Sequence, residues 1–126
     1  MIKIVNRGVL IGIKIDKISK GSVPITDTNE FVQVVTLKHS KGSYLKAHMH
    51  KPKVRQTKKL QECMIVKKGK VRLDLYSEGK KLFKHIFLTA GQAFILLNGG
   101  IGVKIIKDAE IIEVKNGPFR KDKILI

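Results

Sequence analysis

Two histidines two residues apart, His48 and His50, are the side chains in this sequence whose type and spacing best suit chemistry. If the residues around them form a strand, side chains two apart project from one face, and Ala47 and Met49 face the other way. Two imidazoles that converge on one point suit a borderline divalent metal. The pair by itself leaves open a plainer alternative, two histidines partly exposed on a strand.

Glu62 is the next acidic residue along the chain, and it lies in the apolar run 61–67. A strand paired or stacked beside the histidines would bring its carboxylate to the same spot. Two histidines and one carboxylate with open positions form the facial arrangement that is typical of Fe(II) and that Mn, Ni or Zn also accepts. The sequence therefore predicts His48, His50 and Glu62 as one candidate metal site.

The elements that must position these side chains are strands. Helical periodicity is nearly absent, and short runs of β-branched and apolar residues recur between clusters of glycine, serine, asparagine or lysine. A glycine in 67–70 and another in 77–80 predict two tight hairpins. This pattern is typical of an all-β sandwich or closed barrel. The expected strands are 9–18, 31–38, 44–50, 61–67, 70–77, 81–88, 93–97, 101–107 and 109–115.

Length and composition indicate one soluble domain. The 126 residues are enough for a single core. No run approaches the ~20 uninterrupted apolar residues of a membrane-spanning helix, and charges interrupt the N-terminal segment, unlike a signal peptide. We therefore expect a cytoplasmic protein with no membrane partner. Cys63 is the single cysteine, which excludes an internal disulfide, and its apolar neighbours predict a buried, inert thiol.

The formal net charge of +16 raises the question of an anionic partner. Between Glu30 and Glu62 there is no acidic residue, so the positive charge crowds around the histidines. A cationic cleft attracts anions and opposes a bare metal cation. The expected ligand carries carboxylate or phosphate groups, and its candidate contacts in this interval are Tyr44, Lys46 and Arg55. The basic residues of the interval are Lys38, Lys41, Lys46, Lys51, Lys53, Arg55, Lys58 and Lys59.

The positive charge is also compatible with genomic bias and with nucleic acid binding. Lysine far outnumbers arginine, and isoleucine far outnumbers alanine, a skew that an AT-rich genome would produce by itself. Nucleic acid is the rival partner, because lysines along a loop neutralise phosphates without base readout. There is no Trp and aromatic residues are only 6% of the chain, so the stacking platforms of nucleic-acid binders are scarce.

The order of residues around the histidine pair resembles the first cupin motif. Gly42, five further residues, His48-Met-His50, a spacer, Glu62, six residues and Gly69 fill every fixed position. The spacer is longer here than in compact cupins, which makes 51–61 a candidate lid. The segment 91–102 also resembles the second cupin motif, in which a strand-turn-strand supplies one further histidine ligand.

More narrowly, 62–76, 91–102 and 112–119 resemble small single-domain cupins that are often associated with surface-sugar biosynthesis. In those proteins the position of Ile101 is usually histidine, so that fourth ligand is absent here. The resemblance covers about residues 31–123 and implies a cupin-type double-stranded β-helix, a jelly-roll barrel. The single domain 1–126 would then have an N-terminal strand region at 1–30. Cupins include isomerases, epimerases, dioxygenases and pure binders, so the fold implies no one reaction.

The absence of histidine at Ile101 leaves two alternatives. Three ligands still hold Fe, Mn, Ni or Zn, or the pocket is metal-free, as in the sugar-nucleotide epimerases on the same barrel, and His48 or His50 acts as a base. His39 and His85 are each expected to be structural or exposed rather than substitute ligands.

The overall expectation is a cupin-fold protein that binds a small anionic, sugar-derived ligand, with an isomerase or epimerase activity. Glu113 and Lys115, two apart near the end of the last strand, are candidates for the opposite wall of the pocket. The competing class is a non-catalytic binding module. The apolar run 2–18 could serve as an exchanged or edge-pairing strand, so we expect a homodimer.

Overall fold

The computed structural model describes all 126 residues, and it confirms the prediction of an all-β chain. Its strands are joined by turns and extended segments, and no part of the chain forms a helix that could cross a membrane. The strands are β1 (Ile2–Asn6), β2 (Val9–Ile15), β3 (Gly21–Pro24), β4 (Val35–Lys38), β5 (Glu62–Tyr76), β6 (Leu82–Thr89), β7 (Ala93–Leu96) and β8 (Gly100–Lys115).

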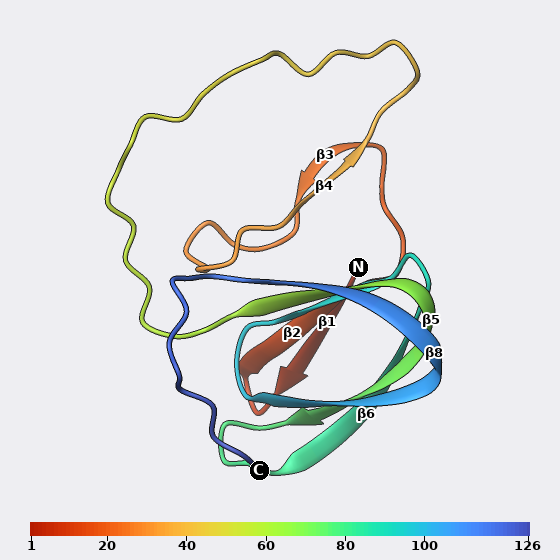
Figure 1. The fold of residues 1–126 in the computed structure, drawn as a ribbon, viewed down its shortest axis with the longest axis vertical. Helices are drawn as coiled ribbons and strands as arrows, with labels where there is room; N and C mark the ends of the chain where they lie inside the picture. Colours follow the sequence, from red (N-terminus) through yellow and green to blue (C-terminus); the bar gives the residue numbers. More distant parts are fainter.

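One six-stranded antiparallel sheet makes up most of the molecule, in the order β1-β2-β7-β5-β6, with β8 paired to β5. The first part of β5 pairs with β7 and the last part with β6, while β8 follows the other edge of β5 along nearly its whole length. The sheet curls into a half-barrel, and β5 bends so that both of its ends face the same side, the mouth of the half-barrel (Figure 1). The strands β3 and β4 form a separate two-stranded ribbon.

The curl of β5 depends on Gly69, and the hairpin predicted at 67–70 is wrong. Gly69 has a φ of +87° and lies in a run of register shifts between Val66 and Val71, so it belongs to a bulge rather than to a turn. A Cβ on Gly69 would lie 2.1 Å from the carbonyl oxygen of Asp108, which is where β8 crosses the bulge. The expected strands 61–67 and 70–77 are therefore one long, bent strand, β5, and the expected strands 101–107 and 109–115 are likewise one strand, β8.

The other predicted hairpin, at 77–80, is confirmed, although the positive φ of its turn falls on Lys80 and not on Gly79. The amide of Lys80 donates to the carbonyl of Ser77 at 2.9 Å, and the amide of Ser77 donates to the carbonyl of Lys81 at 2.8 Å. The N-terminal run 2–18 also forms a hairpin, because β1 pairs with β2 within the chain and β2 pairs with β7.

Two apolar clusters lie on opposite faces of the sheet. The inner face of the half-barrel carries the larger cluster, with Val71, Leu73 and Leu75 of β5 fully buried against Phe94 and Leu88. The smaller cluster lies on the other face of β2 and β7, where Ile13, Ile95 and Cys63 pack beneath residues 25–34. Burial raises the pKa of the Cys63 thiol, which confirms the expected buried cysteine.

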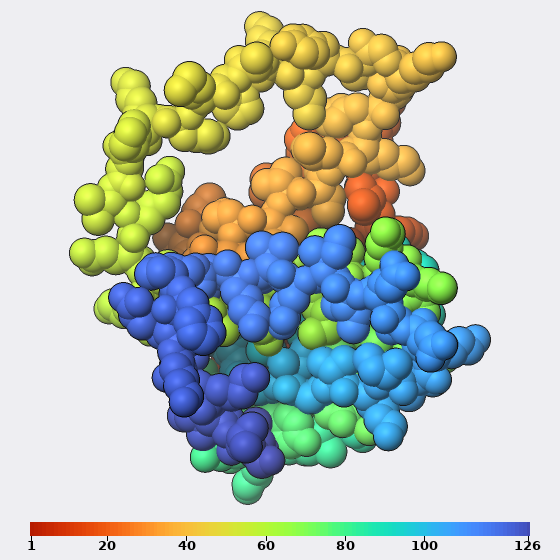
Figure 2. All heavy atoms as spheres, in the orientation of Figure 1, coloured from red at the N-terminus to blue at the C-terminus, as the bar shows by residue number.

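The strand predicted at 44–50 does not form. Residues 39–60 run as an extended segment between β4 and β5, and they arc away from the sheet without pairing to it (Figures 1 and 2). Nearly all of their side chains are exposed, and Met49 is 94% exposed. Strand alternation needs a neighbouring strand to pair with, and this lysine-rich segment has none here.

Candidate functional site

The register between β5 and β8 brings three predicted site residues together. Glu62 lies opposite Lys115, and Met64 lies opposite Glu113. Directly opposed residues share a face of the sheet, as do residues two apart on one strand. Because Met64 belongs to the inner-face cluster, Glu62, Glu113 and Lys115 lie on the inner face as well. We call these three residues the Glu62 cluster.

The distances within the Glu62 cluster describe two carboxylates that share one ammonium group. Nζ of Lys115 is 3.5 Å from Oε2 of Glu113 and 3.9 Å from Oε2 of Glu62. The Glu62 side chain is only 13% exposed, against 37% for Glu113. Glu62 is therefore the desolvated member of the pair, and Glu113 is the member that reaches water.

The surroundings raise the pKa of Glu62 to about 7. Burial makes the largest contribution, and the hydrogen bond with Glu113 and the negative charge of Glu113 add to it. The positive charges of Lys115 and Lys123 act in the opposite direction on the pKa, but they are weaker than the burial of the carboxyl. Glu62 consequently gains and loses its proton close to neutral pH, which is the property a general acid or base requires.

Gln61 fixes the start of β5 and with it the position of Glu62. Its side chain is fully buried. Its Oε1 accepts hydrogen bonds from the amides of Phe31 at 2.9 Å and Val32 at 3.0 Å. Its Nε2 donates to the carboxylate of Glu30 at 2.6 Å. Sequence reasoning missed this residue, because glutamine has no signature that separates a buried hub from an exposed loop side chain.

Asn116 holds the same entry point from the other side. Its Oδ1 accepts a hydrogen bond of 2.7 Å from the amide of Gln61, and its Nδ2 donates to the carbonyl of Lys59 at 3.0 Å. The ammonium group of Lys59 also bonds to the side chain of Asn98. The end of the extended segment is thus anchored to the sheet beside Glu62.

The structure does not bring His48 and His50 to the Glu62 cluster. Both are exposed on the extended segment, where their rings pack edge to face with centroids 5.2 Å apart. His48 Nδ1 donates to the carbonyl of Lys46 at 2.9 Å. Tyr44 and Arg55 are also exposed on this segment. The predicted ligand contacts therefore fall into two separate groups.

The side chains as arranged do not fit a metal ion. No three His, Cys, Asp or Glu side chains lie together in a way that could hold one. At the Glu62 cluster the Lys115 ammonium already occupies the cationic position between the carboxylates. Ile101, the position at which the cupin resemblance implied a missing histidine, lies opposite Leu75 and packs on the inner-face cluster. Metal binding by His48, His50 and Glu62 stays a prediction.

A second polar cluster lies on the outer face, where residues alternate with the buried side chains of β5. Asp74 accepts hydrogen bonds from Arg72 Nε at 2.8 Å and from His85 Nδ1 at 2.6 Å. The bond from Arg72 is the main cause that lowers the pKa of Asp74. Asp74 and His85 are direct cross-strand partners, and the sequence predicted neither this contact nor that of Arg72 with Asp74.

The other histidine considered as a substitute ligand, His39, lies at the end of the ribbon and contacts Ser22 Oγ through Nε2 at 3.0 Å. It is exposed, as expected.

Comparison with known proteins identifies no relative of this chain. No protein-family model, no curated protein and no solved structure matches the chain. The residues themselves define a curled antiparallel sheet with a largely buried carboxyl, Glu62, beside Glu113 and Lys115 on its inner face.

Proposed function

We propose that this chain is a cupin-type barrel protein that binds a small anionic, sugar-derived ligand at the mouth of the half-barrel and exchanges a proton with it through Glu62. The class of reaction is an isomerisation or epimerisation. The observation that carries the proposal is the Glu62 cluster, a desolvated carboxyl with a pKa of about 7 held against a second carboxylate and a lysine.

The chemistry follows from the unequal surroundings of the two carboxyl groups. At neutral pH a proton resides on Glu62 for part of the time, and the more exposed Glu113 is its hydrogen-bond partner. The ionised form of Glu62 takes a proton from a carbon next to a sugar carbonyl, and the protonated form returns it. Lys115 supplies positive charge beside the pair throughout.

The extended segment gives the proposal its second part. Its end is anchored by Lys59 and Asn116, whereas its middle, around 44–55, makes only local hydrogen bonds. We propose that this middle part closes over the mouth when an anion binds, and that Tyr44, Lys46 and Arg55 then contact the ligand. The same closure would bring His48 and His50 towards Glu62, as the cupin resemblance implies.

The experiment combines a binding screen with an exchange assay. Sugar phosphates, sugar acids and matching neutral sugars are screened by ligand-observed NMR, and the ligands that bind are incubated with the protein in D₂O. We expect anionic sugars to bind and one carbon-bound proton to exchange with solvent. Glu62→Gln should abolish the exchange and keep the binding, because glutamine keeps the shape and removes the titration.

The matched control is Glu110→Gln, which removes a carboxylate that lies on β8 but is exposed and paired only with Lys67 at 3.9 Å. It should leave the exchange unchanged. Two outcomes overturn proton transfer by Glu62. One is proton exchange that persists in Glu62→Gln, and the other is an anionic ligand that binds the natural chain without any exchange. The second outcome would favour a non-catalytic binding module.

A polyanion partner is the second candidate, and one observation favours it. The cationic side chains of the extended segment are exposed and have no acidic partner within salt-bridge distance. A titration with salt separates the two candidates. Affinity for a polyanion falls steeply as salt rises, whereas a small ligand at the mouth responds weakly.

A further inference from the structure

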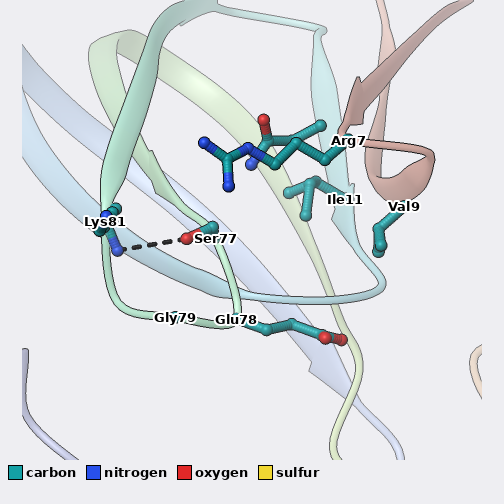
Figure 3. Close-up of a pocket in the computed structure, with 8 residues that line it drawn as sticks. Arg7, Val9, Ile11, Ser77, Glu78, Gly79 and Lys81 are labelled. Atoms are coloured by element: carbon teal, nitrogen blue, oxygen red, sulfur yellow. Dashed lines mark hydrogen bonds between the residues drawn. The ribbon is translucent and has the colours of Figure 1, made fainter.

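A cavity of about 350 Å³ lies at the mouth of the half-barrel, between the β1–β2 turn and the β5–β6 turn (Figure 3). Its apolar floor is formed by Val9 and Ile11, and its size is in the range of small-ligand pockets. The polar lining residues are Asn6, Arg7, Ser77, Glu78 and Lys81. None of these residues was singled out by the spacing of motifs in the sequence.

The cations around this cavity have no partner within the protein. Arg7 and Lys81 make no side-chain hydrogen bond and no ion pair, and the bond at Ser77 Oγ comes from the backbone amide of Lys81 at 3.3 Å. Figure 3 shows Arg7 reaching across from its turn towards Ser77, while the carboxylate of Glu78 points away from the guanidinium group. The lining therefore carries one more positive than negative charge, with the guanidinium group aimed inwards.

The backbone at Arg7 gives independent support. Arg7 and Gly8 are the two loop residues of the β1–β2 hairpin, and their φ values are +49° and +78°. A turn with two such residues favours Asn, Asp or Gly at the first position, and arginine there is strained. A side chain kept at a position that the turn itself disfavours is expected where the side chain has another role.

A smaller cavity of about 160 Å³ lies beside the larger one. Its lining includes Glu78, which also lines the larger cavity, and Leu96, which is the cross-strand partner of Glu62. Because β5 bends back on itself, its Glu62 end and its Tyr76 end, which leads into the β5–β6 turn, lie on the same side of the half-barrel (Figure 1).

We infer that the cavity between the two turns binds the phosphate or carboxylate group of a small ligand, with Arg7 and Lys81 as the cationic contacts. The inference rests on the proposed anionic ligand, but it does not need proton transfer at Glu62. The guanidinium group of Arg7 offers a fork of donors that fits either anion, and the ammonium group of Lys81 adds a second charge.

The test is calorimetric titration with glucose 1-phosphate, glucuronate and glucose, each added to the natural chain and to three variants. We expect the two anionic sugars to bind the natural chain and glucose not to bind. Arg7→Asn should weaken the binding at least tenfold. The same substitution should raise the Tm of the ligand-free protein by a few degrees, because asparagine suits the left-handed position.

Lys80→Asn is the matched control, since Lys80 also has a positive φ, of +65°, and also carries a positive charge, but it does not line the cavity. It should raise the Tm in the same way and change the affinity less than twofold. Glu78→Gln should tighten binding several-fold, because it removes the one negative charge of the lining.

Several outcomes overturn the inference. They are equal affinities of Arg7→Asn and the natural chain, an equal loss in Lys80→Asn and Arg7→Asn, or no binding of either anionic sugar by the natural chain. Glu62→Gln should bind the same anions as the natural chain. Proton exchange that persists in Glu62→Gln would overturn only the proposed role of Glu62, whereas binding that is unchanged in Arg7→Asn would overturn only the role of this cavity.

Discussion

The Glu62 cluster and the extended segment 39–60 both carry residues that the sequence assigned to one site, and the structure gives them opposite surroundings. Glu62 is half-buried, is held by the fully buried Gln61, and has a pKa near 7. His48 and His50 are exposed and contact only each other and the local backbone. The comparison teaches that side-chain type suggests a chemistry, whereas burial and cross-strand register decide which group is tuned for it.

The largest difference between the two regions should appear when glutamine is truncated in each. Gln61→Ala removes the buried side-chain amide that hydrogen-bonds to Phe31, Val32 and Glu30. It should lower the free energy of unfolding by about 3 kcal/mol. Gln56→Ala, on the exposed segment, should change it by less than ~0.5 kcal/mol. Urea denaturation measures both, and two equally small changes would remove the distinction between the regions.

The next effect is the pH dependence that Glu62 gives to stability. Its folded pKa of about 7 lies above the ordinary 4.5, so the native state binds the proton more tightly than the unfolded state does. The contribution is fully present below about pH 4.5 and is lost as the pH rises through 7. We expect a loss of about 1–3 kcal/mol across this range.

Glu62→Gln should flatten the stability profile between pH 5 and pH 8, because glutamine does not titrate. Urea denaturation at four pH values in this range measures it, with Glu110→Gln as the control that keeps the slope of the natural chain. A slope that is the same in Glu62→Gln would show that Glu62 has an ordinary pKa.

A smaller effect of opposite sign is expected on the acid side, at the outer-face cluster. Arg72 and His85 lower the pKa of Asp74, so its contribution to stability is present above the ordinary pKa and is lost as the pH falls through the lowered value. Asp74→Asn should therefore reduce the loss of stability in strong acid. Thermal unfolding at pH 2 to 5 measures this effect. If the Tm falls with pH as steeply in Asp74→Asn as in the natural chain, the ion pairs of Asp74 with Arg72 and His85 do not contribute to stability.

The smallest effect is expected on the extended segment. The double variant His48→Ala/His50→Ala should leave the free energy of unfolding within ~0.5 kcal/mol of the natural chain, because both rings are exposed. Elemental analysis after reconstitution with Fe, Mn, Ni and Zn tests the metal prediction in the same pair of proteins. Metal bound by the natural chain and not by the variant would show that His48 and His50 hold a metal ion.

Local sequence patterns predicted the class of fold and several elements, since alternation and glycine placement are local properties. They failed at Gly69, because a glycine with positive φ can belong to a bulge as well as to a turn. The close packing of the Asp108 backbone against Gly69, which distinguishes the bulge, involves a strand distant in the sequence. They failed again at 44–50, where alternation presupposes a neighbouring strand. The hairpin at 77–80 succeeded because the turn needs no distant partner.

The sequence singled out Glu62, Glu113 and Lys115 one by one, but it did not predict that they lie together. The spacing of Glu113 and Lys115 indicated one face, but their position beside Glu62 depends on the β5–β8 register, which joins segments far apart in the chain. The same holds for Asp74 and His85, which meet through the β5–β6 register. Gln61 was missed for a different reason, because its importance is a matter of burial alone.

The most direct test of the account is the pKa of Glu62, measured by NMR from the side-chain carboxyl carbon of ¹³C-labelled glutamate. The account predicts a titration near 7 in the natural chain. In Glu113→Gln the pKa of Glu62 should fall but stay above its ordinary value, because burial is the largest cause of the shift. A Glu62 that titrates near 4.5 in both proteins would contradict the proposed proton exchange at the inner face.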